Sequence, residues 1–249
     1  MKMSIPGPEN IQRYDKHFIP LESNPEVFTE LAHKLGLSTS LGFQDVLSID
    51  DPELLGFVPR PALALILVFP TTEKYEKRVQ DEDAKLEEFH SSGDVVFFKQ
   101  TINNACGLYA ILHAICNGEA RQRIDDTSIM AQLLDASLAS DLDKLAQALE
   151  GDKALEVAYA GVAGKGDTEA PLNAEDEVDY HYIAFAKSSK TNHLYQLDGD
   201  RKRPIDLGEL TADEDVLSEK CLSVIRGMMA MEDENLNFSL MTLTEQAGM

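Results

Sequence analysis

The apolar and polar positions along the chain predict helices and strands that follow one another within one domain. Residues 25–35 repeat their apolar side chains at helical spacing, with Asn24 as an N-cap before them and Gly36 as a stop after them. Residues 62–69 are apolar on both faces, which is typical of a central strand. We expect further helices at about residues 72–90, 126–149 and 212–231, and further strands at 94–98 and 237–244.

Two cysteines lie on one predicted helix, in the segment "QTINNACGLYAILHAICNG" (residues 100–118). Two asparagines of N-cap type precede its apolar run, and an Asn-Gly pair follows it as a stop. Cys106 falls in the first turn, where unpaired N–H groups and the positive end of the helix dipole favour a thiolate. Cys116 falls in the last turn, where carbonyl oxygens disfavour one. The pattern therefore predicts Cys106, and not Cys116, as a nucleophile.

A predicted hairpin supplies a base and an orienting group. Residues 180–186 and 193–198 have the pattern of two strands joined by a six-residue polar turn, and this register places His181 opposite Asp198. A lone strand histidine is usually structural, but a nucleophilic cysteine needs a base that a third group orients. Gln100 stands just ahead of the cysteine helix, where its amide and the N–H of the cysteine could hold an oxyanion.

Residues 159–179 have no apolar period and are rich in glycine, alanine and acidic residues. We expect a long loop there, of the kind that forms a lid or a binding loop. Its "GKGDT" partly matches a phosphate loop, but Tyr159 stands where that motif needs its first glycine and Gly166 where it needs Ser or Thr. The phosphate interpretation is rejected.

Charge and cysteine content narrow the classes of function. The net charge of −22 would repel phosphates, which argues against nucleic acid or an anionic membrane as partner and favours a basic partner segment. The ordinary alternative is that the acidic residues serve only to keep the protein soluble. Three cysteines, without CxxC or zinc-ligand spacing, argue against a disulfide framework and a metal site. We expect no cofactor, no metal and a reducing compartment.

The chain of 249 residues shows no apolar leader and no run near the ~18 apolar residues that a membrane span needs. We therefore expect one soluble domain over residues 1–249, located in the cytoplasm with the nucleus as a second location, and a monomer.

Several segments resemble the ubiquitin C-terminal hydrolases, the UCH-type deubiquitinases. They are "QTINNACG" (100–107), "DYHYIAFA" (179–186) and "HLYQLDGDRKRPIDLGE" (193–209), with further similarity in "PLESNPEVFTELAHKLGL" and "GDTEAP". Two departures are a longer turn between the catalytic strands and Asn103, where the family often has Gly. The resemblance implies an α/β (α+β) papain-like fold: a central, mainly antiparallel sheet flanked by helices, with a knotted backbone. Residues 159–179 would form the loop that crosses over the active site.

The resemblance also implies a Cys-His-Asp thiol hydrolase that uses Cys106, His181, Asp198 and Gln100 to remove small or unfolded adducts from the C-terminal glycine of ubiquitin. Ubiquitin, with its small adducts and precursors, is the expected partner. The segments expected to bind ubiquitin comprise Pro20, Leu21, Glu22, Ser23, Asn24 and Pro25; Ala163, Gly164, Lys165, Gly166, Asp167, Thr168, Glu169 and Ala170; and Asn235, Leu236, Asn237 and Phe238, continuing to Leu240.

Two alternative functions stay open on the sequence. One is a protein that binds and stabilises ubiquitin with little turnover. The other is a hydrolase of a related ubiquitin-like modifier. The presence of all four candidate catalytic residues favours the ubiquitin hydrolase.

Overall fold

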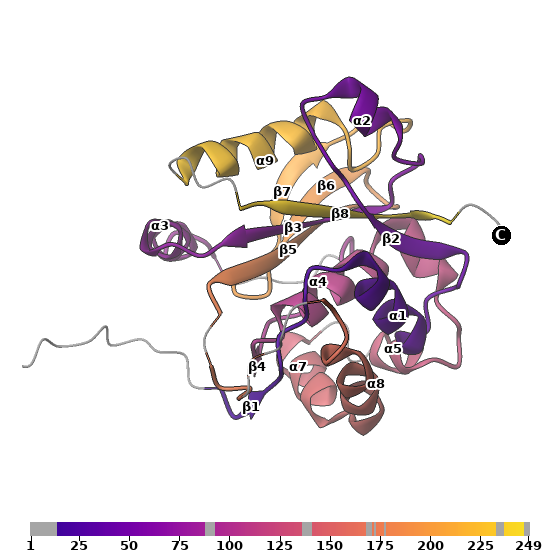
Figure 1. Cartoon of the computed structure of the whole chain (residues 1–249), viewed down its shortest axis with the longest axis vertical. Coiled ribbons are helices and arrows are strands. Elements are labelled where there is room, and N and C mark those ends of the chain that lie inside the picture. Colours follow the sequence, from indigo (N-terminus) through magenta and orange to yellow (C-terminus); the bar gives the residue numbers. More distant parts are fainter. Residues whose placement is uncertain are drawn as a thin grey trace, which may run out of the picture.

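The computed structural model describes residues 14–87, 93–135, 141–167, 171, 173–176, 178–232 and 237–246. Its centre is a six-stranded antiparallel sheet in the order β2-β8-β3-β5-β6-β7 (Figure 1). The strands are β2 (Leu41–Asp45), β3 (Ala64–Pro70), β5 (Tyr180–Lys187), β6 (His193–Leu197), β7 (Ile205–Glu209) and β8 (Ser239–Glu245). A separate parallel pair joins β1 (Lys16–His17) to β4 (Ile102–Asn103).

Helices cover both faces of the sheet (Figure 1). They are α1 (Pro25–Leu35), α2 (Pro52–Gly56), α3 (Glu73–Asp83), α4 (Cys106–Ile115), α5 (Ile129–Leu133), α7 (Leu142–Gly151), α8 (Lys153–Ala163) and α9 (Glu219–Met231), with a 3-10 helix at Gly118–Arg123. Helix α9 lies over one face, whereas α1, α4 and α8 lie on the other. No helix in the described part of the chain is long and apolar enough to cross a membrane.

Strand β3 divides the core between the two faces. Its even positions, Ile66 and Val68, pack with the α1 and α4 side, and its odd positions, Leu65 and Leu67, pack with α9. All seven residues of the strand are buried, because helices occupy both sides of the sheet. The predicted central strand and the predicted sheet flanked by helices are confirmed.

Helix α1 is confirmed with its predicted limits. Asn24 accepts hydrogen bonds from the backbone N–H groups of Glu26 (2.9 Å) and Val27 (3.4 Å), which would otherwise lack partners. Gly36 ends the helix at a φ of 117°, a conformation that glycine adopts without a steric penalty.

The strand predicted at residues 94–98 is wrong. Side chains of α4 and of the residues that follow it hydrogen-bond the backbone groups of this segment, in place of a partner strand. The N–H of Phe98 donates to His113 Nε2 (3.0 Å), and the N–H of Val96 donates to Asn117 Oδ1 (2.7 Å). Asn117 Nδ2 donates in return to the carbonyl of Val96 (2.9 Å). The segment therefore runs along the helix into the candidate site.

The limits of three other predicted helices also differ in the structure. The helix expected at 126–149 consists of α5 and α7, with residues 136–140 outside the described part. The helix expected at 72–90 ends at Asp83, and the one expected at 212–231 begins at Glu219, after Ser218 as N-cap. Sequence patterns do not predict β1, β2, β7 or α2.

The loop predicted at residues 159–179 is wrong in its first part. Residues 159–163 are the end of α8, which begins after the N-cap Asp152 and buries Leu155, Tyr159 and Val162 on one face. The connection to β5 therefore starts at Gly164. Residues 168–170, 172 and 177 of it lie outside the described residues.

The hairpin register predicted for β5 and β6 is wrong by two residues. Ala186 pairs with Tyr195 and Lys187 with Leu194, so the strands continue further toward the turn than expected. The Ser188 hydroxyl accepts hydrogen bonds from the N–H groups of the next residues in the turn, and Asn192 adopts a φ of 58°. A tighter turn than the six-residue one results.

Candidate active site

Cys106 is the first residue of α4, as predicted for a first-turn cysteine. The predicted asparagine cap is wrong, because Ala105 occupies the N-cap position without a side-chain hydrogen bond. Asn104 adopts a left-handed φ of 56°, which asparagine tolerates better than most residues. Its side chain does not cap the helix. Its Nδ2 donates to the carbonyls of Ala174 (3.0 Å) and Asp176 (2.7 Å), in the connection between α8 and β5.

His181 and Asp198 form a buried pair. His181 Nε2 lies 2.8 Å from Asp198 Oδ1, and the two side chains are 5% and 1% exposed. The observed register makes this a diagonal contact across the hairpin rather than the direct one predicted, and such neighbours remain within reach of long side chains. Asp198 Oδ1 also accepts from the N–H of Asp200 (3.0 Å), and Oδ2 accepts from the Tyr75 hydroxyl (2.9 Å).

The charges of the pair stabilise each other. Burial works against both charged forms, yet the His181 imidazolium and the hydrogen bonds from the ring, the Asp200 N–H and the Tyr75 hydroxyl lower the pKa of Asp198 to about 2. Burial likewise acts to lower the pKa of His181, but the charges of Asp198 and Asp200 outweigh it. With further hydrogen bonds to Asp198 and to Cys106, they hold this pKa well above its ordinary value. The imidazolium therefore persists at neutral pH.

The other ring nitrogen of His181 faces a second carboxylate. His181 Nδ1 lies 3.7 Å from Asp200 Oδ2, and the Asp200 side chain is 42% exposed. Cys106 acts to raise the pKa of His181, and Cys106 Sγ lies 4.0 Å from the carbonyl of Tyr180, the residue before the histidine. The structure thus brings the predicted nucleophile, base and orienting group together.

Gln100 is buried beside the loop that follows β6. Its N–H donates to the carbonyl of Gly199 (2.8 Å), and a Cβ atom at position 199 would lie 2.9 Å from Gln100 Cβ. Only glycine lets the two segments approach so closely. The glycine between Asp198 and Asp200 therefore holds the fourth predicted residue next to the histidine pair.

The remaining two cysteines differ from Cys106. Cys116 and Cys221 are completely buried free thiols, and burial raises the pKa of each well above its ordinary value. Both remain protonated thiols. Cys106, in contrast, lines an open cleft.

This cleft has a volume of about 550 Å³ and contains part of the predicted binding surface. Its lining includes Cys106, Val68, Pro171, Tyr180, Tyr182 and Ser239, and the predicted residues Pro20, Leu21, Glu22, Ser23, Ala163, Gly164, Lys165, Asn237 and Phe238. Asn24, Pro25, Gly166 and Asp167 line a neighbouring groove of about 680 Å³. Thr168, Glu169, Ala170, Asn235 and Leu236 lie outside the described residues.

The sequence shows no metal-ligand spacing, yet the fold brings three possible ligands together. His181, Asp198 and Asp200 each offer one atom, and these atoms lie within 4.8 Å of one another. Two of the three are already hydrogen-bonded to each other as the imidazole–carboxylate pair.

Comparisons with known proteins identify the family. The family model described as "Ubiquitin carboxyl-terminal hydrolase, family 1" matches residues 18–230. The chain is 33% identical over 230 residues to the ubiquitin carboxyl-terminal hydrolase isozyme L1 of Homo sapiens, covering 92% of this chain and 98% of that protein. The chain belongs to ubiquitin carboxyl-terminal hydrolase family 1. The expected family, and with it a hydrolase of this type, is confirmed.

Further relatives of this hydrolase agree. A ubiquitin carboxyl-terminal hydrolase of Aplysia californica is 34% identical over 222 residues, covering 88% of this chain and 98% of that protein. The fold is similar to that of the Trichinella spiralis UCH37 catalytic domain bound to ubiquitin vinyl methyl ester. That similarity has a TM-score of 0.71 and 22% identity, and covers 94% of this chain and 97% of that chain.

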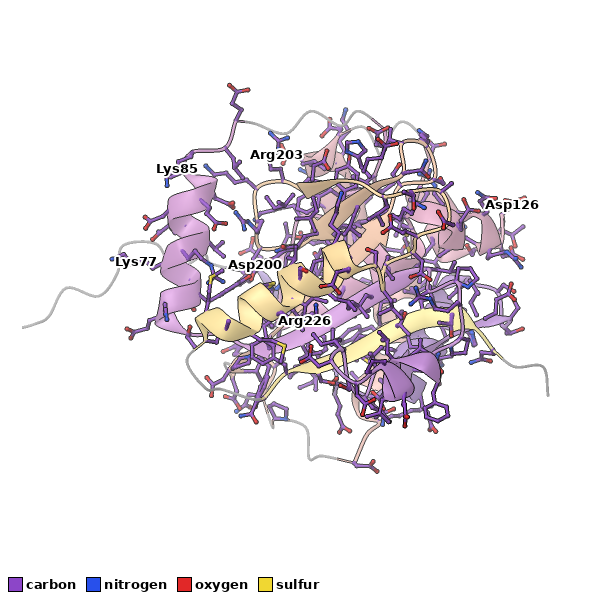
Figure 2. All side chains as sticks on the ribbon, turned by 90° about the horizontal axis from the view of Figure 1, so that it is seen from above. Lys77, Lys85, Asp126, Asp200, Arg203 and Arg226 are labelled. Atoms are coloured by element: carbon purple, nitrogen blue, oxygen red, sulfur yellow. The ribbon has the colours of Figure 1, made fainter. Side chains whose placement is uncertain are left out.

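The sequence predicts helix α3 of this hydrolase but not its contact with Asp198. Helix α3 supplies the Tyr75 hydroxyl to the carboxylate itself, and Asp83 accepts from Arg201 Nε (2.9 Å) and from the N–H of Lys202 (2.8 Å). Figure 2 shows Lys77 on the outer side of this helix and Asp200 on its inner side. The pattern at 72–90 predicts a helix, but nothing local in it shows which residues face Asp198.

Proposed function

We propose that this chain is a cysteine-type ubiquitinyl hydrolase that cleaves the bond after the C-terminal glycine of ubiquitin. The observation that carries the proposal is the 2.8 Å pair of His181 and Asp198, buried beside Cys106 at the start of α4 and at the wall of an open cleft. Family membership and the ubiquitin vinyl methyl ester bound to the Trichinella spiralis neighbour support ubiquitin as the substrate.

In the first half of the reaction, the Cys106 thiolate attacks the carbonyl carbon of the glycine. Asp198 holds His181 through Nε2, so the proton for the leaving group comes from Nδ1. As the tetrahedral intermediate collapses, the C–N bond breaks, the amine leaves with this proton, and a thioester remains on Cys106. Neutral His181 then takes a proton from water, which attacks the thioester. Breaking the C–S bond restores the thiolate–imidazolium pair and releases the ubiquitin carboxylic acid, which loses its proton to water.

The oxyanion of each tetrahedral intermediate is assigned to the side-chain amide of Gln100 and the backbone N–H of Cys106. Gln100 is buried and held beside the active-site loop, so the donor needs little reorganisation when negative charge develops.

The cleft is proposed to hold the C-terminal tail of ubiquitin. The cleft and the neighbouring groove are lined by described residues of the predicted binding segments. These residues come from the 20–25 segment, the end of α8 and the start of β8, which meet at the cleft. The −22 charge would attract a basic tail. We propose a single catalytic domain over residues 1–249, with small or unfolded adducts as leaving groups. Free thiols at all three cysteines agree with the cytoplasm, and with the nucleus as a second location.

The test uses ubiquitin vinyl methyl ester and a fluorogenic ubiquitin amide. Wild-type protein should form a covalent adduct and turn over the amide, whereas Cys106→Ser should do neither. Cys116→Ala, which removes a buried thiol outside the site, should retain both activities. Activity should survive a chelator and be lost to iodoacetamide. Turnover by Cys106→Ser at near wild-type rate would overturn the assignment.

The same measurements separate the alternatives. Adduct formation without turnover would indicate a ubiquitin-binding protein. Faster turnover of an amide of a related modifier than of ubiquitin would indicate that modifier as the substrate.

A further inference from the structure

The two buried residues of helix α3 both contact the loop that follows β6. Tyr75, near the start of the helix, donates to the carboxylate of Asp198, at the beginning of this loop. Asp83, the last residue of the helix, binds Arg201 and the backbone of Lys202, at the end of the loop. Helix α3 therefore holds the loop at both of its ends.

Arg201 occupies a buried site at the C-terminal end of α3. Its side chain is 6% exposed, and its guanidinium remains charged at any pH at which the protein works. Nε donates to Asp83 Oδ1 (2.9 Å), Nη2 lies 2.8 Å from the same oxygen, and Nη1 donates to Glu82 Oε2 (2.8 Å). Asp83 Oδ2 accepts from the N–H of Lys202 (2.8 Å), so both oxygens of Asp83 bind the loop. Such charge-assisted bonds from a planar fork fix a geometry closely.

The same arginine closes the turn that begins at Asp198. The N–H of Arg201 donates to the carbonyl of Asp198 (3.1 Å), and the N–H of Asp200 donates to Asp198 Oδ1 (3.0 Å). Lys99 Nζ donates to the carbonyls of Asp200 (2.7 Å) and Arg201 (3.2 Å). Arg201 thus joins this turn to α3, and the turn carries the carboxylate that lies 2.8 Å from His181.

The location of this ion pair indicates its role. Apolar residues of similar volume often replace a buried ion pair without loss of stability, so stability alone is a weak reason to bury one. Its directional hydrogen bonds, in contrast, fix the separation of two elements. Here the two elements are the helix that donates to Asp198 and the loop that carries Asp198.

We propose that Arg201, through Asp83, is a positioning residue that holds the loop of residues 198–202, and with it the Asp198 carboxylate, in place against His181. This inference rests on the proposed catalytic roles of His181 and Asp198. Among the described residues, those that line the cleft do not include Arg201. Arg201 therefore acts on kcat and not on ubiquitin binding.

The experiment measures kcat and KM of Arg201→Met on a fluorogenic ubiquitin amide. Methionine keeps an unbranched apolar side chain and removes the five N–H donors. The substitution should lower kcat about 10-fold with KM unchanged, which is less than the ~10²-fold loss that a misplacement of 1 Å causes. In an Asp83→Asn background, Arg201→Met should cause a smaller loss than in wild type, because the two residues act as one unit.

Arg226 of α9 is the matched control. Its Nε donates to Asp50 (2.7 Å) and its Nη1 to Glu219 (2.7 Å), so the same two atoms of this arginine also bridge two carboxylates. It lies on α9, outside the site (Figure 2). Arg226→Met should therefore leave kcat unchanged.

A pH profile separates positioning from a loss of stability. The groups that face His181 are Asp198 and Asp200 of the loop, Cys106 of α4 and the ring of Tyr75 of α3. When the loop is no longer held, its two carboxylates stabilise the imidazolium less, and the basic limb of kcat/KM should move to lower pH. A protein that is only less stable would keep this limb in the wild-type position.

Three results would overturn the inference: a wild-type kcat in folded Arg201→Met, a basic limb that does not move, or a loss as large in the Asp83→Asn background as in wild type. Thermal unfolding shows whether each variant is folded. If Arg201→Met does not fold, the double variant with Asp83→Asn replaces it, since that variant leaves no lone carboxylate at position 83. It should show the lower kcat and the shifted limb, and a wild-type kcat in it would contradict the inference.

Failure of the proposed function has its own signature. If Asp198→Ala keeps wild-type kcat, the catalytic pair is wrong and the inference falls with it. If Asp198→Ala loses activity and Arg201→Met does not, only the role of Arg201 is wrong.

Discussion

The hydroxyl of Tyr75 donates a 2.9 Å hydrogen bond to Asp198 Oδ2, while the other oxygen of this carboxylate holds His181. Tyr75 is buried, and its ring packs edge-on against Phe69, which in turn contacts the imidazole edge-on. Helix α3 thus holds the carboxylate oxygen that does not bond the histidine.

Removal of this hydroxyl should weaken catalysis without unfolding the protein. In Tyr75→Phe, Asp198 loses one donor while the packing against Phe69 is kept. We expect kcat to fall about 3- to 10-fold, which corresponds to one hydrogen bond of roughly 1 kcal/mol. Steady-state kinetics on a ubiquitin amide would measure the loss, and thermal unfolding would verify the fold. An unchanged kcat would show that Asp198 needs no support from α3.

Asp200 should set the upper pH limit of activity. The reaction needs the His181 imidazolium, so activity is present below the pKa of His181 and is lost as the pH rises through it. Asp198 and Asp200 both raise this pKa. In Asp200→Asn one negative charge is removed, and the basic limb of the kcat/KM profile should move to lower pH.

The control for this change is Asp206→Asn, which removes a carboxylate 2.9 Å from His193, outside the site. Its pH profile should match that of wild type. An Asp200→Asn profile with its basic limb in the wild-type position would mean that Asp200 does not act on the catalytic histidine.

Asn104 should couple the connection between α8 and β5 to the nucleophile segment. Asn104→Gly removes both hydrogen bonds to this connection while glycine still adopts the left-handed backbone. Amide hydrogen exchange at residues 173–176 should become faster. Asn192→Gly, which changes the other left-handed asparagine, in the hairpin turn, should leave that exchange unchanged. Equal exchange rates in Asn104→Gly and wild type would contradict the coupling.

The same connection should limit the size of the leaving group. It is joined to α8 at one end and to β5 at the other, and Lys165 binds Glu30 of α1 at 2.7 Å. A folded protein linked by an isopeptide bond should therefore be cleaved poorly. Inserting about 10 Gly/Ser residues after Asp167 adds roughly 17 Å of r.m.s. reach.

This insertion should accelerate cleavage of isopeptide-linked di-ubiquitin and leave turnover of a small ubiquitin amide nearly unchanged. Both rates are measurable on the same preparations. Wild-type protein that already cleaves di-ubiquitin as fast as the small amide would show that the connection is no size filter.

Local patterns along the sequence were sufficient for the elements that carry the predicted chemistry. Asn24 and Gly36 mark the ends of α1, the apolar run before Pro70 marks the central strand, and Cys106 stands at the start of α4. These features depend on capping, glycine conformation and periodicity, which act over a few neighbouring residues. His181 and Asp198 were paired from a hairpin pattern for the same reason, although the register was wrong.

Contacts between distant segments were decided only by the tertiary structure. The turn geometry at Ser188 and Asn192 sets a register two residues from the predicted one, and the side chains of His181 and Asp198 still meet across the diagonal. The support of Asp198 by Tyr75 and the link from Asn104 to the loop join residues 70 or more positions apart. No local pattern encodes such pairs, because the packing of helices against the sheet determines which side chains meet.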